Sequence, residues 1–396
     1  MAKFIFVFID GTGNKPGQTD EDEDGQEVVV ESNVLKLWKA LTANDSVYTP
    51  GDLAGDDLLK YYGVVQSVVV GGKCLGEAVY FNGVGVQGGA VQEKLEGGLG
   101  SGTSVRIRDA YRFIAEQFDP GDKICLFGFS RGAYAARSLA GFIDHVGLPS
   151  NRRIVSEHEL SRMYASYREG KKYYGALRQF LQPADIEFIG AWDTVGSLAL
   201  HDTLNDFHMT SPCNVRHMRH ALALDEGRPH FKPSYWKSDT KESLVECWFT
   251  GAHSNIGGGY RSPGLSNIAY IWMLREFDRA LDLGINVLQD NVYSADEAPE
   301  NVMAEVRDSF KEFYRSFMKF ALRLKSWKGK PEYRKIKEGQ LIHPSVFECM
   351  CKVPDTKTYT PMARFENQPI SLKFIHQHLA KAEDWPLEDE LLKHIQ

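Results

Sequence analysis

Short apolar runs alternate with amphipathic stretches along roughly the first 250 residues of the chain. The apolar runs are rich in β-branched and aromatic residues, which predicts strands buried on both faces. These strands cover residues 4–9, 123–127, 186–192 and 244–250, and a longer strand-like pattern covers residues 68–81. Apolar residues at helical spacing predict helices at residues 33–41, 104–117 and 133–145. Strands that alternate with helices predict an α/β fold, with a mostly parallel sheet and helices on both of its faces.

The same pattern predicts the domain organisation. No internal repeat and no linker interrupts it, and beyond residue 266 the spacing becomes mostly helical. We therefore expect one large catalytic core over residues 1–265, in which residues 146–184 form a candidate helical insertion. A mostly helical C-terminal part, residues 266–396, is expected to pack on that core.

Composition narrows the class of protein. The chain has 396 residues, of which 43% are hydrophobic and 25% charged, as in ordinary globular proteins. Lys and Arg number 46 against 53 Asp and Glu, and the resulting net charge of −7 argues against a nucleic-acid partner. The six cysteines are too few for a disulfide scaffold. Because the apolar run at residues 4–9 is too short for a signal peptide, we expect a soluble protein made in the cytoplasm, with reduced thiols.

The most informative segment is Gly128-Phe129-Ser130-Arg131-Gly132, which matches G-x-S-x-G. It follows a predicted strand and precedes a predicted helix, the context in which this motif forms a nucleophile elbow. A sharp strand-to-helix turn exposes the central serine, and the helix N-terminus offers free N–H groups to a developing oxyanion. We therefore predict Ser130 as a nucleophile and the Arg131 N–H as an oxyanion donor.

A serine nucleophile needs a base and an acid that orients it. In this fold the acid and then the histidine follow the serine along the chain, each after a strand. Asp193 follows the strand at residues 186–192, and His253 follows the strand at residues 244–250. The rival acids are Asp202 and Asp225, and Asp193 itself has the alternative of capping the next helix.

Asp10-Gly11-Thr12 follows the first predicted strand and has three interpretations. In a hydrolase, this loop gives the second oxyanion-hole N–H, from Gly11 or Thr12. In a metal-dependent phosphoesterase, Asp10 would be a nucleophile or a metal ligand. The third interpretation is a tight Asx-type turn.

Two further segments bear on ligand binding and on membrane contact. The glycine-rich residues 83–102 lack the acid of a dinucleotide site and the lysine of a phosphate loop, so no cofactor is predicted, and no metal ion either. Residues 310–330 interleave aromatic and basic side chains at helical spacing. We expect this stripe to pack on the protein's own core; transient contact with a membrane is the alternative.

Five motifs together resemble the α/β-hydrolase family, and within it the type VI secretion phospholipase effectors and their uncharacterised relatives. They are the Asp-Gly-Thr motif in residues 8–14, the elbow in 128–137, Trp-Asp-Thr-Val-Gly in 192–196, Ala-Leu-Asp-Glu-x-Arg-x-x-Phe in 223–231 and Ala-His-Ser-Asn-Ile-Gly-Gly-Gly-Tyr in 252–260. The likeness spans about residues 4–265. It implies a triad of Ser130, Asp193 and His253 that cleaves phospholipid acyl esters. It also implies export by a signal-peptide-independent secretion system, with secretion or immunity partners.

The sequence thus predicts a serine esterase or lipase that hydrolyses acyl esters, with phospholipid as the expected substrate. The triad would work through an acyl-enzyme on Ser130. Two alternatives stay open at this point. One is a non-catalytic hydrolase fold used for binding or as a scaffold, and the other is a metal-dependent phosphoesterase that uses Asp10.

Overall fold

The structure is a computed structural model, and its centre is an eight-stranded sheet. It describes residues 2–21, 25–42, 64–84, 98–150, 152–196, 214–229, 231–236, 244–285, 304–311, 331–352 and 359–380. The sheet order is β12-β11-β10-β9-β6-β1-β5-β4. The strands are β1 (Phe4–Ile9), β4 (Val64–Val70), β5 (Lys73–Phe81), β6 (Lys123–Phe129), β9 (Ile186–Trp192), β10 (Val215–Ala223), β11 (Leu244–Phe249) and β12 (Leu341–Ile342). Neighbouring strands are parallel except β4 and β5, which confirms the predicted mostly parallel α/β sheet.

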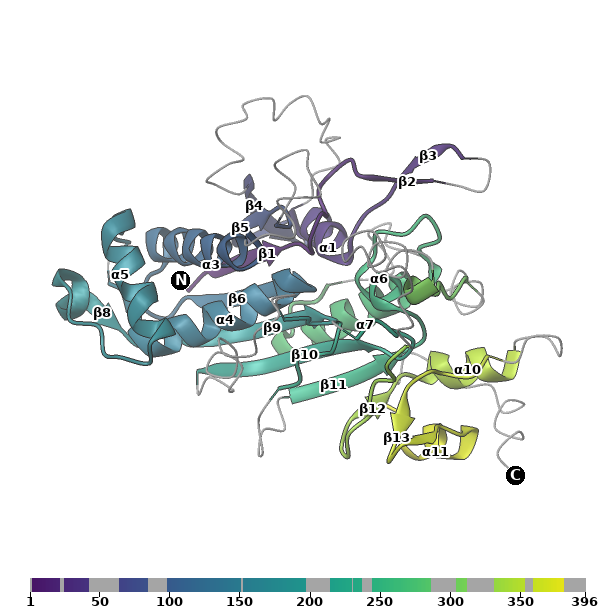
Figure 1. Ribbon diagram of the computed structural model, residues 1–396. Coiled ribbons are helices and arrows are strands. Elements are labelled where there is room, and N and C mark those ends of the chain that lie inside the picture. The colour runs from purple at the N-terminus through teal and green to yellow at the C-terminus, as the bar shows by residue number, and fades with distance from the viewer. Residues whose placement is uncertain are drawn as a thin grey trace.

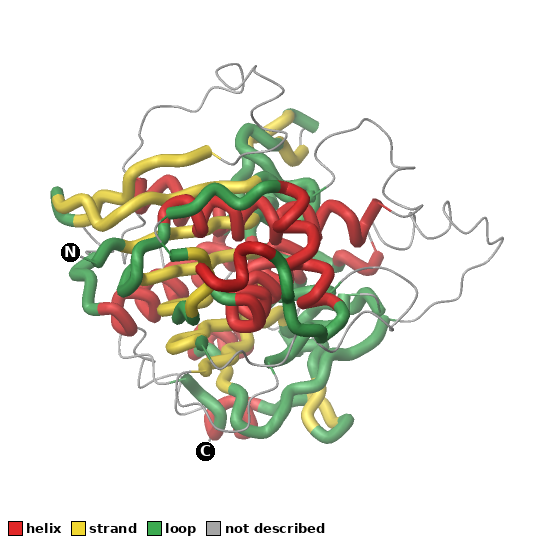
Figure 2. Tube along the Cα trace, turned by 90° about the vertical axis from the view of Figure 1, so that its left-hand side faces the viewer, coloured by secondary structure: helices red, strands yellow, loops and turns green. Residues whose placement is uncertain are grey.

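Helices cover both faces of this sheet, as Figures 1 and 2 show. They are α3 (Gly98–Gln117), α4 (Arg131–Val146) and α5 (Glu157–Arg168) on one face, and α1 (Asn33–Thr42) and α7 (Gly264–Leu281) on the other. Strand β1 shows why residues 4–9 are continuously apolar: both faces of the strand are buried. Because side chains alternate along a strand, Ile5 and Val7 enter the core under α3 and α4, while Phe6 and Phe8 enter the core under α1 and α7.

The structure adds detail to the sequence pattern at two stretches of the sheet. The strand-like stretch at residues 68–81 is a hairpin of β4 and β5, which turns at Gly71 and Gly72, both with positive φ. The polar, His-rich stretch before residue 244 contains β10, a strand inside the sheet. The polar side chains of β10 hide the apolar pattern from which a buried strand is predicted. They are tolerated there because Arg219 pairs with Glu276 at 2.5 Å and His220 contacts Glu246 at 3.1 Å.

The C-terminal residues extend the sheet. Strand β12 pairs with β11, and α10 (Pro344–Lys352) and α11 (Leu372–Gln377) follow it along the chain. In Figure 1 this yellow end of the chain lies beside the β11 edge. A third hydrophobic cluster joins Trp248 of β11 to Ile342 and Phe347. The smaller elements are β2 (Thr19–Glu21), β3 (Glu27–Val29), β7 (Leu148–Pro149), a 3-10 helix (Ala176–Phe180), β8 (Leu181–Gln182), α6 (His253–Gly257), β13 (Arg364–Phe365) and β14 (Gln368–Pro369).

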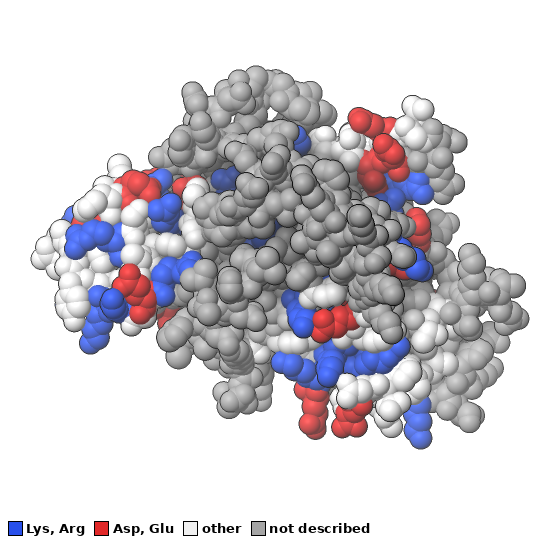
Figure 3. Space-filling model, viewed as in Figure 1, with Lys and Arg blue, Asp and Glu red and all other residues white. Residues whose placement is uncertain are grey.

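The visible surface mixes both signs of charge. On the face drawn in Figure 3, acidic and basic side chains are interspersed around the α5 end of the molecule. Arg108 and Arg112 pair there with Glu157.

Within the described parts of the chain, no helix is long and apolar enough to cross a membrane. Of the aromatic and basic stripe, Phe310 is buried and Lys311 is exposed, and residues 312–330 lie outside the described residues.

Candidate active site

Ser130 occupies the turn between β6 and α4. Its backbone has φ 57° and ψ −122°, a conformation that is rare for a residue with a side chain. The turn is close to neighbouring backbone: a Cβ added at Gly132 would lie 2.0 Å from the carbonyl oxygen of Ile9. The Ser130 N–H donates to the carbonyl of Trp192 at 3.0 Å, which ties the elbow to the end of β9. The elbow is therefore held in a strained geometry by both adjacent strands.

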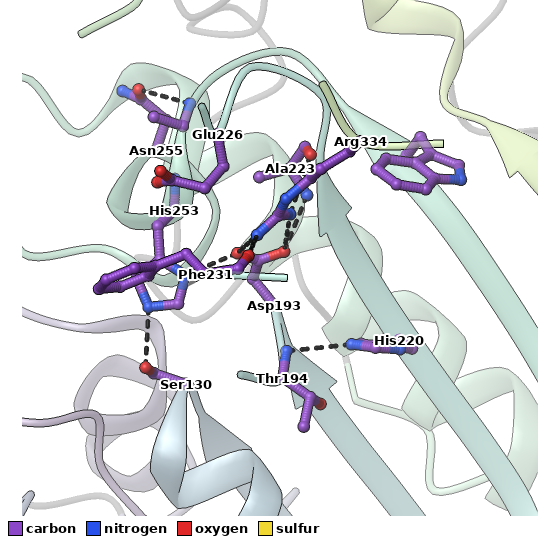
Figure 4. A network of polar contacts seen from close by, with 12 residues as sticks. Ser130, Asp193, Thr194, His220, Ala223, Glu226, Phe231, His253, Asn255 and Arg334 are labelled. Carbon is purple, nitrogen blue, oxygen red and sulfur yellow. Dashed lines mark hydrogen bonds and ion pairs between the residues drawn. The ribbon is translucent and has the colours of Figure 1, made fainter. Parts of the chain in front are cut away.

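The structure brings Ser130, His253 and Asp193 together at the C-terminal ends of β6, β11 and β9 (Figure 4). His253 Nε2 lies 2.8 Å from Ser130 Oγ, and His253 Nδ1 lies 2.6 Å from Asp193 Oδ2. Since a carboxylate only accepts hydrogen bonds, Nδ1 must be the donor, which leaves the Nε2 lone pair for the serine hydroxyl. This is the arrangement that proton transfer from a serine requires.

Aromatic rings enclose the imidazole. The Phe129 ring centroid lies 4.6 Å from that of His253, and the Phe231 ring lies edge-on at 5.1 Å. Burial lowers the pKa of His253 below its usual value, and Asp193 acts in the opposite direction. The imidazole is therefore held neutral at neutral pH, as a base that accepts a proton must be.

Arg334 binds the acid of this group and was not found from the sequence. Its Nη1 lies 2.5 Å from Asp193 Oδ1 and its Nη2 lies 2.9 Å from Oδ2, and the same nitrogens donate to the carbonyls of Ala223 and Phe231. Burial would raise the pKa of Asp193, but Arg334 and His253 outweigh it and hold that pKa below its usual range. Because Arg334 stands 141 residues after Asp193, no local pattern could have linked them.

A second buried pair holds the residue that follows the acid. Asp193 has φ 39°, and the N–H of Thr194 donates to His220 Nε2 at 3.1 Å. His220 in turn donates through Nδ1 to Glu246 at 3.1 Å. These side chains of β10 and β11 fix the turn that aims the Asp193 carboxylate at His253. Neither His220 nor Glu246 is among the site residues predicted from the sequence.

The loop after β1 lies against the elbow. The Gly11 N–H donates to Asp10 Oδ1 at 2.7 Å, so it is already occupied. Among the described residues, the N–H groups of Thr12 and Arg131 have no protein acceptor. The Arg131 Nε donates to Thr12 Oγ1 and joins the two loops. The loop after β1 and the elbow thus each keep an N–H group without a protein acceptor, on Thr12 and on Arg131.

The Asp10 carboxylate is buried, and its oxygens accept hydrogen bonds within the fold. Its carboxylate is buried and accepts hydrogen bonds from Ser32 Oγ and Tyr80 OH, both at 2.6 Å, besides Gly11. Burial raises the pKa of Asp10 to about 6 despite these bonds. The described residues hold no group of three or more His, Cys, Asp or Glu side chains that is placed to bind a metal ion. The contacts of Asp10 are those of a side chain that braces the loop after β1.

Neither of the rival acids, Asp225 and Asp202, is seen in contact with the His253 ring. Asp225 is buried and accepts hydrogen bonds from Gly251, Tyr359 and Met362 instead of His253. Asp202 lies outside the described residues. A further buried carboxylate, Glu226, accepts from the backbone N–H of His253 at 3.3 Å and from Ser309. Figure 4 places Glu226 beside His253, where it holds the backbone of the base rather than its ring.

The chain has relatives among known proteins. Residues 3–276 match the family model of the catalytic domain of Tle1-like type VI secretion phospholipase effectors. An uncharacterized protein of Saccharomyces cerevisiae is 38% identical over 144 residues, and the match covers 32% of this chain and 20% of that protein. The chain therefore spans about a fifth of the length of that curated relative.

Two solved structures are also similar. One is an uncharacterized protein from Pseudomonas aeruginosa, with 15% identity, a TM-score of 0.40 and coverage of 76% of this chain and 50% of that chain. The other is the Tle1 effector bound to the VgrG spike of the type 6 secretion system, with 19% identity, a TM-score of 0.30 and coverage of 66% and 52%. This chain spans about half of each.

Proposed function

Since this chain belongs to the family of Tle1-like type VI secretion phospholipase effectors, through their catalytic domain, we propose that it is a serine esterase that cleaves phospholipid acyl esters. One observation carries the serine mechanism: Ser130, His253 and Asp193 form a continuous hydrogen-bonded line, with spacings of 2.8 and 2.6 Å. The strained backbone of Ser130 supports it, because such strain is characteristic of functional turns.

The first half of the proposed reaction acylates the enzyme. Ser130 Oγ attacks the carbonyl carbon of the ester while His253 Nε2 takes the hydroxyl proton. The imidazolium that forms is stabilised by Asp193. The negative charge on the carbonyl oxygen is held by the N–H groups of Arg131 and Thr12. As the tetrahedral intermediate collapses, the C–O bond breaks and the imidazolium returns its proton to the leaving alkoxide.

The second half releases the acid. His253 removes a proton from water, and the hydroxide attacks the acyl carbon bound to Ser130. The bond from the acyl carbon to Ser130 Oγ breaks, and the imidazolium protonates the serine. One ester and one water thus give one carboxylic acid and one alcohol. His253 must be neutral at the start of each half, which its lowered pKa supports.

We propose that the C-terminal part, residues 266–396, packs on the core of residues 1–265 and completes the catalytic unit. Arg334 supports this, because it supplies the cation that faces the triad acid. Strand β12 supports it too, because it extends the sheet of the core. We propose residues 146–184 as an insertion that lies away from the triad.

The cellular role follows from the family. We propose that the chain is made in the cytoplasm and exported by a type VI secretion system, with a secretion partner and an immunity partner. The proposed substrate is a phospholipid, reached by transient contact with a membrane. No nucleic acid is proposed as a partner, since the net charge is −7.

The test of the proposed function is direct. The purified chain is incubated with phospholipid vesicles, and the products are identified by mass spectrometry. We expect free fatty acid and lysophospholipid, and labelling of Ser130 by a fluorophosphonate probe. A folded protein that releases no fatty acid and takes no label at Ser130 would instead be a non-catalytic hydrolase fold used for binding.

A further inference from the structure

Arg131 carries a buried charge that the proposed chemistry does not use. Its side chain stands at the start of α4, and the residue is 6% exposed. The Nε donates to Thr12 Oγ1, while Nη1 is buried without a hydrogen-bond partner. Within the described residues, no carboxylate forms an ion pair with this guanidinium. Burial lowers the pKa of Arg131 to about 10.

Two other buried arginines have more polar partners than Arg131, although each keeps a buried Nε without one. Arg334 forms two hydrogen bonds to the carboxylate of Asp193. Arg137, on the same helix as Arg131, donates to the carbonyls of Ser234 and Tyr235 and stacks on the Trp236 ring at 4.6 Å. Arg131 has one hydroxyl in place of these partners. A buried cation without a counter-charge destabilises the fold, so its presence beside a reacting group points to a ligand.

The position of Arg131 identifies what that ligand is. The residue follows Ser130 directly, and its backbone N–H is one of the two proposed oxyanion donors. Its Nε contacts Thr12, which supplies the other donor. The guanidinium therefore bridges the two loops that would hold the ester carbonyl. An anion joined to that ester by a short tether would therefore come within reach of the guanidinium.

We propose that the Arg131 guanidinium binds the phosphodiester of a glycerophospholipid whose acyl ester lies at Ser130. The inference rests on the proposed function and names the side chain that would recognise the phosphate of its substrate. In such a lipid only a few bonds separate the acyl ester from the phosphate, and the phosphate oxygens are ionised at neutral pH. A planar guanidinium is the side chain best suited to bind phosphate oxygens. Nη1 would donate to one of them while Nε stays on Thr12.

The test compares two substrates at once. The ratio of kcat/KM on a short-chain phosphatidylcholine to that on a neutral diacylglycerol of the same acyl length is measured below the micellar concentration. We expect Arg131→Met to lower this ratio about 10- to 100-fold, the range for loss of a buried charge-assisted hydrogen bond. Arg131→Lys keeps the charge and should recover most of the ratio. Arg112→Met is the matched control, because Arg112 of α3 is paired with Glu157 of α5, outside the site described above, and it should leave the ratio unchanged.

A soluble competitor separates the phosphodiester of the substrate from free phosphate. Glycerophosphocholine should inhibit hydrolysis of the neutral ester by the wild type, and inorganic phosphate at the same concentration should not. Inhibition by inorganic phosphate alone would assign the site to free phosphate and overturn the proposal.

The remaining outcomes are also decisive. A ratio for Arg131→Met within about twofold of wild type overturns the assignment of Arg131 while the esterase stands. If the wild type hydrolyses neither substrate, the proposed function and this inference both fail. We expect Arg131→Met to melt no lower than the wild type, because it removes an unpaired buried cation. A variant that fails to fold would mean that Arg131 serves the fold, and would overturn the proposal.

Discussion

Arg334 and Asp193 form a bidentate ion pair that is buried behind the proposed catalytic base. Arg334 Nη1 contacts Oδ1 at 2.5 Å, and Nη2 contacts Oδ2, the oxygen that also accepts from His253, at 2.9 Å (Figure 4). The proposed acid of the triad thus faces both a fixed cation and a titrating imidazole. This relationship makes the charge of Asp193 insensitive to pH and moderates its effect on His253.

We expect Arg334→Met to destabilise the protein by about 3–5 kcal/mol, the usual result of leaving one member of a buried ion pair alone. The same change removes a cation that opposes protonation of His253. The acid limb of the kcat/KM profile should therefore move to higher pH. Urea denaturation and a pH–rate profile measure the two effects, and Arg334→Lys, which keeps the charge, should show the smaller shift. A profile that stays in place would contradict this account of Arg334.

The wild-type pH profile follows from the direction of the His253 shift. The base works only when neutral, so activity should fall as the pH drops through the pKa of His253. Because burial lowers that pKa, the midpoint of the acid limb should lie below the usual histidine value of 6.5. Initial rates on a soluble ester across the acid range give this midpoint. A midpoint above that value would mean that Asp193 outweighs burial.

Ser130→Ala should lower kcat/KM on short p-nitrophenyl esters by about 10³-fold or more, because the nucleophile is removed while the oxyanion donors remain. The variant should fold like the wild type, since the methyl group of alanine fits where the serine was. Steady-state kinetics with a thermal melt measure both. Wild-type turnover in a pure, folded variant would remove Ser130 from the mechanism.

Asp10 should make stability fall as the pH rises. Its pKa is 3.8 when unperturbed and about 6 in the fold, where burial raises it. The folded state therefore binds this proton more tightly, and the stability so gained is present at low pH and lost as the pH rises through 6. Relative to Asp10→Asn, the wild type should lose about 3 kcal/mol between about pH 4 and pH 7. Denaturation curves at several pH values test this, and parallel curves for the two proteins would refute it.

Gly132→Ala should disturb the elbow, because its Cβ would lie 2.0 Å from the Ile9 carbonyl oxygen. We expect a loss of at least about 1–3 kcal/mol, the range for overpacking, and a fall in activity as Ser130 moves. Gly121→Ala is the matched control, since a Cβ there meets no atom within 4 Å and only its positive φ is strained. Thermal melts and ester kinetics compare the two. If both variants lose little stability and activity, the elbow can move to accept the added Cβ, and this prediction is wrong.

The sequence by itself determined most of the sheet and the elbow. Strands buried on both faces leave continuous apolar runs, so residues 4–9 and 186–192 were predicted with the bounds that the structure has. The fold class followed from their alternation with helices. The turn of the elbow requires glycine beside Ser130, and this local requirement is visible in the sequence. Order along the chain sufficed to predict His253 and Asp193 as its partners, with Asp202 and Asp225 left as rival acids.

Only the tertiary structure decided how polar residues are paired. Strand β10 was missed because its arginine and histidine side chains read as surface residues until Glu276 and Glu246 are brought against them. Arg334 could not be linked to Asp193, since 141 residues separate them and an ion pair leaves no periodic pattern. The proposal of Thr12 rather than Gly11 as the second oxyanion donor rests on one hydrogen bond, from the Gly11 N–H to Asp10. Burial of apolar residues leaves a periodic pattern in the local sequence. The partner of a buried charge leaves no such pattern, because it comes from a distant segment that only the fold brings close.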